Sequence, residues 1–132
     1  MENKKELILN DVIINNQAYQ GNKNIQVLAA PSAFLIGTCA FADCENLEEV
    51  HLGLDITRIS VGAFRGCKKL KHVWFLILDE NKIIEIARNA FFGCSDITFH
   101  IFGTDAINNP YLNEYAKKHG FRVTGFSERE DA

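Results

Sequence analysis

Several features that define large classes of proteins are scarce in this sequence. Its 132 residues include two prolines, one tryptophan and one methionine, and no apolar run approaches the roughly 20 residues that a membrane-spanning helix needs. The stretch Leu7-Ile8-Leu9, which follows the charged start, is too short for the apolar core of a signal peptide. We therefore expect no membrane insertion and no export, which would leave the chain in the cytoplasm.

A large excess of charge of either sign is also missing. The chain has 14 basic and 17 acidic residues, a formal net charge of -3, with no extended basic stripe and no acidic tail. Lys68, Lys69 and Lys71 do cluster, but we interpret them as a solvated turn rather than a phosphate site. The charge pattern therefore predicts no nucleic-acid partner.

Catalytic motifs are absent as well. The sequence contains no Gly-rich phosphate loop, no Gly-x-Ser-x-Gly nucleophile elbow and no pair of carboxylates at a recurring spacing. It has no Cys-x-x-Cys pair, and Cys39 with Cys44 is a weak zinc signal. We expect a protein that is not an enzyme and that holds no cofactor.

What the sequence does contain is an internal repeat, aligned on an alanine followed by an aromatic residue. The steps between copies are 22, 23 and 27 residues. An isoleucine stands four positions before each alanine, and an asparagine or cysteine stands four positions after it. The anchors are Ala18-Tyr19, Ala40-Phe41, Ala63-Phe64 and Ala90-Phe91, and the residues four positions after the alanines are Asn22, Cys44, Cys67 and Cys94. Self-similarity at this period indicates a solenoid, in which each unit buries its apolar side against its neighbours.

Alternating apolar segments recur once in each copy. They predict strands at residues 6–9, 25–30, 47–52, 70–75 and 98–102. Because about 17 residues of return chain join successive strands, the strands cannot form hairpins and must be parallel, with right-handed crossovers.

The return segments carry the Ala-aromatic pairs. Their composition favours a compact turn or short helix rather than a second sheet, with Phe41, Phe64 and Phe91 stacked beneath it as an aromatic ladder. The third return segment has an insertion at residues 76–82. We interpret this insertion as tolerated length variation, either a longer strand or a protruding loop.

The repeat pattern ends at Gly103, and a helix signal follows. Asn109 is a suitable N-cap before Pro110, and Gly120 ends the helical periodicity. A closing strand is expected at residues 121–124. We expect one domain over residues 1–126, made of a partial repeat at 6–17, repeats at 18–102 and a cap at 103–126, and then a polar tail at 127–132.

The motif Ile59-x-x-x-Ala63-Phe64-x-Gly66-Cys67-x-x-Leu70-x-x-Val73 resembles the BspA-like (Treponema pallidum type) leucine-rich repeats, which have roughly 23 residues each. Copies of the motif cover residues 36–50 and 86–99, the helix at 111–121 looks like the one that often ends such arrays, and the resemblance extends over about residues 7–124. It implies an α/β leucine-rich-repeat solenoid: a right-handed arc with a parallel β-sheet on its concave side, short turns or helices on its convex side and a C-terminal capping helix.

The resemblance also bears on location and role. The resemblance implies a location on bacterial or protist cell surfaces, with a role in adhesion and partner binding. The start of the chain instead predicts no export, so the sequence supports two interpretations of the compartment. The chain departs from the family pattern at two positions. Gly53 stands where a proline often follows the strand, and Asn22 replaces the cysteine of the first full repeat.

The cysteines fit a structural role. Cys44, Cys67 and Cys94 share one repeat position and should form a ladder of buried thiols. A disulfide between neighbouring rungs is conceivable but not favoured, because three thiols leave one unpaired. Cys39 lies outside the ladder and could be exposed. A catalytic pair of Cys67 and His72 is disfavoured, because the cysteine should point into the core and the histidine out of it.

The outward side of the strands is the candidate functional surface. Alternation places Val27, Glu49, His72 and Thr98 in one row across the sheet, and Ala29, His51, Trp74 and His100 in the next. Trp74 would then lie between two histidines, and tryptophan is enriched at binding hot spots. The predicted partner-binding residues are Glu49, His51, His72, Trp74 and His100.

These residues support three hypotheses. The preferred one is a non-enzymatic module that binds a protein partner through the concave sheet face. The alternative is a structural module without a ligand of its own, which spaces other domains or self-associates through a repeat edge. Whatever its role, we expect the chain to be a monomer, although edge-to-edge association is possible. A ligand or metal site built from Glu49, His51 and His72 is less favoured. His51 and His100 lie two strands apart, about 9.6 Å, too far to share one ion.

Overall fold

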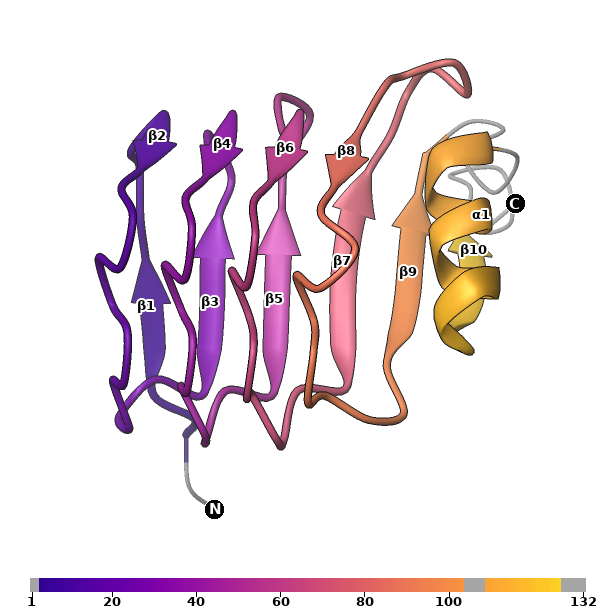
Figure 1. Cartoon of the computed structure of the whole chain (residues 1–132). Coiled ribbons are helices and arrows are strands. Elements are labelled where there is room, and N and C mark those ends of the chain that lie inside the picture. The colour runs from indigo at the N-terminus through magenta and orange to yellow at the C-terminus, as the bar shows by residue number, and fades with distance from the viewer. Residues whose placement is uncertain (1–2, 104–108, 127–132) are drawn as a thin grey trace.

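The computed structural model of the chain describes residues 3–103 and 109–126 as a coil of repeats that carries two parallel sheets. The order of the larger, six-stranded sheet is β1-β3-β5-β7-β9-β10, and that of the smaller, four-stranded sheet is β2-β4-β6-β8. Figure 1 shows the strands side by side along the stack, with helix α1 at its C-terminal end. The larger sheet comprises β1 (Glu6–Ile8), β3 (Val27–Ala30), β5 (Glu49–Leu52), β7 (His72–Leu76), β9 (Thr98–Phe102) and β10 (Arg122–Phe126). The predicted parallel strands are thus confirmed, although three of them begin two residues later than expected.

The return segments were predicted to form turns or short helices rather than a second sheet, and this prediction was wrong, because they contain the strands of the four-stranded sheet. Its strands are only two residues long: β2 (Ile13–Ile14), β4 (Leu35–Ile36), β6 (Arg58–Ile59) and β8 (Glu85–Ile86). The second residue of each is the isoleucine that precedes the Ala-aromatic pair. Isoleucine suits a pleated surface with one buried face, and Ile36 and Ile59 are fully buried.

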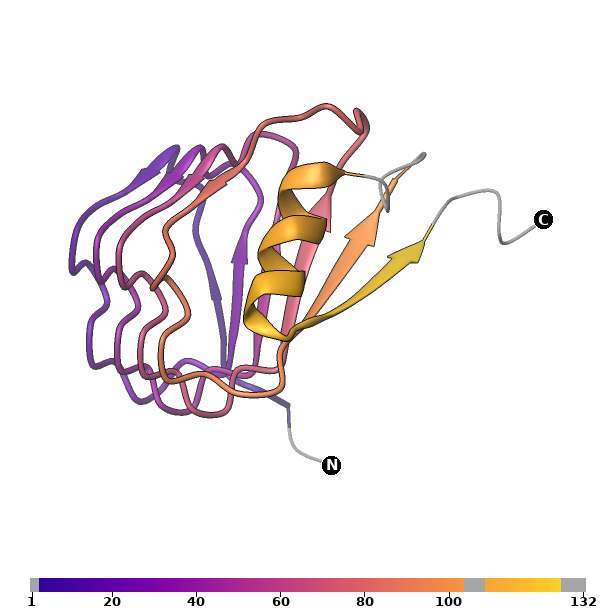
Figure 2. The same cartoon turned by 45° about the vertical axis from the view of Figure 1, so that its right-hand side comes forward.

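The remainder of each return segment is turn rather than helix. In the first three copies two positions adopt a left-handed backbone, one just before the alanine and one three residues after it. These positions are Gln17 and Gly21, Cys39 and Asp43, and Gly62 and Gly66, with φ between 54° and 76°. Left-handed residues at this spacing stop a right-handed helix from propagating. The chain therefore folds back in compact steps, which lie in register in Figure 2.

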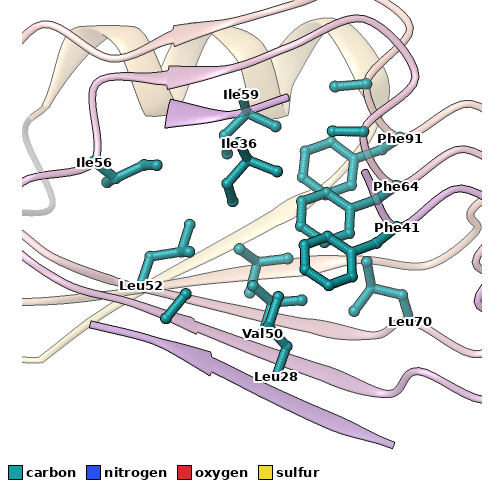
Figure 3. Close-up of a cluster of buried hydrophobic side chains, with 14 of the residues drawn as sticks. Leu28, Ile36, Phe41, Val50, Leu52, Ile56, Ile59, Phe64, Leu70 and Phe91 are labelled. Carbon is teal, nitrogen blue, oxygen red and sulfur yellow. The ribbon is translucent and has the colours of Figure 1, made fainter. Parts of the chain in front are cut away.

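The core lies between the two sheets and the turns. Phe41, Phe64 and Phe91 stack with ring centroids 5.5 and 5.3 Å apart, and Tyr19 extends the stack 5.3 Å beyond Phe41. Figure 3 shows the three phenylalanines parallel to one another beside Ile36 and Ile59. The predicted aromatic ladder is confirmed.

The thiol ladder runs beside the aromatic one. Cys67 and Cys44 are buried and Cys94 is half-buried, and each Sγ donates a hydrogen bond to the carbonyl of the aromatic residue one repeat earlier, at 3.1 to 3.2 Å. Burial raises the pKa of Cys44 and of Cys94 to about 11, which keeps both thiols protonated as donors. All four cysteines are free, and Cys39 is half-buried.

The C-terminal end follows the prediction. Helix α1 (Pro110–His119) begins after the N-cap Asn109 and ends at Gly120, whose φ of 72° is left-handed. Strand β10 then pairs in parallel with β9. In the insertion, β7 continues to Leu76, and the chain beyond it forms a loop that rises above the other returns in Figure 1. Within the described ranges, no helix has the length and apolarity needed to cross a bilayer. The predicted tail at 127–132 lies outside these ranges.

Candidate interaction surface

The outer face of the six-stranded sheet carries the residues that the sequence singled out. The strand register aligns Val27, Glu49, His72 and Thr98 in one row, and Ala29, His51, Trp74 and His100 in the next. Both predicted rows are confirmed. Val27 and Thr98 are nevertheless buried, so the exposed part of the first row is formed by Glu49 and His72.

Trp74 forms the centre of a continuous ring stack. Its ring lies 5.7 Å from that of His51, nearly parallel at 3°, and 4.1 Å from that of His100, at 17°. Parallel pairing brings equivalent side chains from adjacent strands together, which is why the stack follows the hydrogen-bonding direction of the sheet. Each face of the indole is therefore stacked against an imidazole ring.

His100 links this stack to the neighbouring strands. Its Nε2 lies 2.9 Å from Nδ1 of His72, and its Nδ1 lies 2.8 Å from the hydroxyl of Thr124 on β10. Only one of the two facing nitrogens can carry a proton if the contact is a hydrogen bond. Burial, and then the neighbouring His72, lower the pKa of His100, so the neutral form of His100 is favoured at neutral pH.

A charged border lies below the stack. Lys4 Nζ is 3.0 Å from both Glu48 Oε1 and Glu49 Oε2, and His51 Nε2 is 3.1 Å from Glu49 Oε1. Partial burial alone would raise the pKa of Glu49, but the hydrogen bonds from Lys4 and His51 outweigh burial and leave that pKa lowered. The carboxylate therefore stays ionised and orients the His51 ring. A hollow of about 230 Å³ adjoins this border, and Lys69 and Lys71 also line it.

The apolar residues that extend the stack were not predicted from the sequence. Leu76 and Phe102 are paired across β7 and β9 one outward position beyond Trp74 and His100, and both are half-buried. Ile8 on β1 continues the Trp74 row at its other end and is exposed. The alternation that selected residues 72 and 74 continues to Leu76, but the predicted strand ended at residue 75, and residues 76–82 were interpreted as an insertion that forms either a longer strand or a loop.

The other chemistries considered for this face are less well supported. Cys67 is buried with its thiol on the Phe41 carbonyl, whereas the side chain of His72 is exposed on the outer face, so the two do not form a catalytic pair. No group of three or more metal-ligating side chains comes together in the part of the chain that the structure describes. What the face offers is an aromatic ridge with apolar residues on one side and a charged border on the other.

Two parallel sheets joined by tight turns, with an aromatic ladder and a terminal helix, define a leucine-rich-repeat solenoid. The profile described as "BspA type Leucine rich repeat region (6 copies)" matches residues 6–116. The chain therefore belongs to the BspA-type leucine-rich repeat family, as the sequence resemblance indicated. No curated protein matches it.

Among solved structures, a leucine-rich cell surface protein from Faecalibacterium prausnitzii A2-165 has the same fold. The match has a TM-score of 0.63 and 21% sequence identity, and it covers 91% of this chain. The chain spans only 31% of that protein's length. At this identity the likeness supports the fold alone.

Proposed function

We propose that the chain is a non-enzymatic interaction module that binds a protein partner through the outer face of its six-stranded sheet, the concave face expected from the sequence. The observation that carries the proposal is the His51–Trp74–His100 stack, held rigid from both sides and continued by Leu76 and Phe102. A rigid aromatic centre within a polar rim is the usual anatomy of a protein-binding hot spot.

The covered faces of Trp74 argue for a protein rather than a sugar or a nucleobase. Stacking recognition of a sugar or base needs an open ring face, and His51 and His100 occupy both faces of the indole. The half-buried ring stack and the apolar side chains beside it form a ridge that can be covered by a complementary apolar surface. Glu49, Lys4 and His72 would then form the rim and fix the orientation of the partner.

We further propose a surface-exposed, adhesion-type role. It rests on the family resemblance and on the structural neighbour, which is described as a cell surface protein. Labelling intact cells of the source organism with an antibody against the chain tests this part separately. Signal only after permeabilisation would contradict the surface location and leave the binding face untouched.

The binding face is tested by capture from lysate and surface fractions with the immobilised chain. The comparison is between the wild-type chain, the double variant Trp74→Ala/His51→Ala and the variant Phe92→Ala, whose ring is exposed away from this face. Circular dichroism and urea unfolding first establish that each variant is folded. We expect a partner retained by the wild type and by Phe92→Ala and lost by the double variant.

The captured partner is then titrated against the three proteins. Loss of a hot-spot aromatic costs about 2 kcal/mol or more, which corresponds to roughly 30-fold weaker binding. Equal capture by all three folded proteins would overturn the proposal. The hypothesis of a structural spacer without a ligand of its own would then be the better supported one.

A further inference from the structure

A second surface lies at the C-terminal edge of the four-stranded sheet, where β8 faces helix α1. Two adjoining hollows of about 380 and 470 Å³ form a groove between them, a size typical of ligand pockets. One wall is β8. The other is one stripe of the helix, residues one turn apart that include Tyr111, Glu114 and Lys118. Figure 1 shows β8 as the last strand of its row, with α1 beyond it.

Strand β8 presents an incomplete backbone ladder to this groove. One repeat earlier, the carbonyls of Thr57 and Ile59 accept hydrogen bonds from the amides of Glu85 and Ala87, at 2.8 and 2.9 Å. The register makes Ile84 and Ile86 the equivalents of those two acceptors. No donor within residues 3–103 or 109–126 reaches the carbonyls of Ile84 and Ile86. Their positions suit two amides of a further parallel strand.

The side chains of β8 indicate which type of residue the middle of such a strand should have. Ile14, Ile36 and Ile59 form a buried inward row across the small sheet, and Ile86 continues that row but is only half-buried. Ile86 lacks the next rung that covers each of the others. An aliphatic residue opposite Ile86 would therefore extend the isoleucine row.

The charges along the groove give the incoming strand a direction. Glu85 and Glu114 lie in the hollow beside the start of β8, and Arg88 lies in the other hollow, while Lys118 borders both. Glu85 already pairs with Arg58 at 3.5 Å, but both side chains are well exposed, so this contact competes only weakly. A strand parallel to β8 would meet acidic side chains first and basic ones about three residues later.

We propose that this groove binds an extended peptide segment as a fifth parallel strand, with the sequence pattern basic, aliphatic, any residue, acidic. The basic side chain lies beside Glu85 and the aliphatic one against Ile86. The acidic side chain lies near Arg88 and Lys118. The backbone supplies two amides to Ile84 and Ile86, so affinity comes from the ladder and selectivity from the three side chains.

The test uses the peptide acetyl-Ser-Lys-Ile-Thr-Glu-Ser-amide and its charge-reversed counterpart, acetyl-Ser-Glu-Ile-Thr-Lys-Ser-amide. Each is titrated into the isotope-labelled chain while amide chemical shifts are followed. We expect shifts confined to β8 and α1, with binding at least about ten-fold tighter for the first peptide. Methylation of the lysine and threonine amide nitrogens of the first peptide should abolish binding, because it removes both ladder donors.

A charge-swap variant gives the decisive comparison. The double substitution Glu85→Lys/Arg88→Glu changes two exposed side chains and should reverse the preference between the two peptides while the protein spectrum otherwise stays unchanged. Absence of binding, equal binding of both peptides, or shifts on the Trp74 face would each overturn the proposal. The alternative occupant of the groove is a second copy of the chain, and sedimentation of the wild-type chain alone tests for it. Concentration-dependent dimerisation that Glu85→Lys/Arg88→Glu removes would assign the groove to a second copy instead.

Discussion

Adjacent residues in the last repeat have opposite environments, although both are phenylalanine. Phe91 is 3% exposed and contacts the rings of Phe64, Phe99 and Phe121, whereas Phe92 is 69% exposed. We predict that Phe91→Ala lowers the free energy of unfolding by about 3–5 kcal/mol, because a buried ring is replaced by a cavity. Phe92→Ala should change it by less than about 0.5 kcal/mol. Urea unfolding followed by circular dichroism measures both values. If Phe91→Ala lowered the free energy of unfolding as little as Phe92→Ala, the end of the aromatic ladder would contribute little to the stability.

The lowered pKa of His100 predicts how the free energy of unfolding depends on pH. Its pKa in the folded chain is lowered from the ordinary value of 6.5, first by burial and then by His72. Between the folded and unfolded pKa values the unfolded chain binds more protons, so the free energy of unfolding should fall as pH drops below about 6.5. The lowered pKa of Glu49 acts in the same direction only below its ordinary value of 4.5. Urea midpoints at several pH values from 7.5 to 5.0 therefore isolate the histidine contribution.

The variant His100→Gln is the control for this effect. It keeps a polar side chain facing Thr124 and His72 but cannot gain a proton. We expect its midpoint to fall less than that of the wild type over the same pH range. An equally steep fall in both proteins would assign the pH dependence to another group.

At the scale of elements, the sequence predicted the long strands well and the short ones not at all. Alternation over five or six residues identified segments such as 47–52, and the register then placed His51, Trp74 and His100 in one row. A two-residue strand such as Ile13–Ile14 is too short to show alternation. Its pairing depends on stacked neighbours in other repeats, a tertiary effect that local patterns do not encode.

Gly53 illustrates a constraint that only the packed elements show. A Cβ at this position would lie 2.0 Å from the carbonyl oxygen of Pro31 in the preceding repeat. From the sequence alone, only the replacement of a proline by glycine is visible there. The groove between β8 and α1 was missed for a similar reason, because residues from two distant elements form it.

Asn109 joins two elements and gives the prediction at this scale. Its side-chain oxygen accepts from the amides of Tyr111 and Leu112, which caps helix α1, while its Nδ2 donates to the carbonyls of Glu80 and Lys82 in the inserted loop. We predict that Asn109→Ala lowers the free energy of unfolding by about 1–2 kcal/mol or more, because both the cap and the loop contacts are lost.

Two conservative variants separate these roles. Asn109→Ser keeps an N-cap acceptor and should lose less than Asn109→Ala, while limited proteolysis should cleave the loop near residues 79–82 faster in both. Asn109→Asp keeps the cap but directs a carboxylate at two carbonyls, so it should destabilise more than Asn109→Ser. Equal stability of all three variants and the wild type would show that the helix and the loop do not depend on this residue.

At the scale of the whole molecule, the chain is a stack in which each repeat contacts mainly its neighbours. The amide of the aromatic residue in one repeat donates to the alanine carbonyl of the next repeat, and this contact recurs with the same length. Tyr19 donates to Ala40, Phe41 to Ala63 and Phe64 to Ala90, each at 2.8 Å. Because the three bonds have the same length, a difference in the hydrogen exchange of these amides would reflect position in the stack rather than the length of the bond.

We predict that these amides differ in hydrogen exchange despite their matched bonds. In a repeat stack, stability is approximately the sum of repeat and interface terms, and an end repeat has one interface where a central repeat has two. Tyr19 lies in the first full repeat and is half-buried, whereas Phe41 and Phe64 are fully buried within the stack. Native-state exchange measured by NMR should therefore show Tyr19 opening with a smaller free energy than Phe41 and Phe64, and added denaturant should bring the three together. Equal protection in the absence of denaturant would instead mean that the repeats open only as one cooperative unit, in which case the ends are as firmly held as the centre.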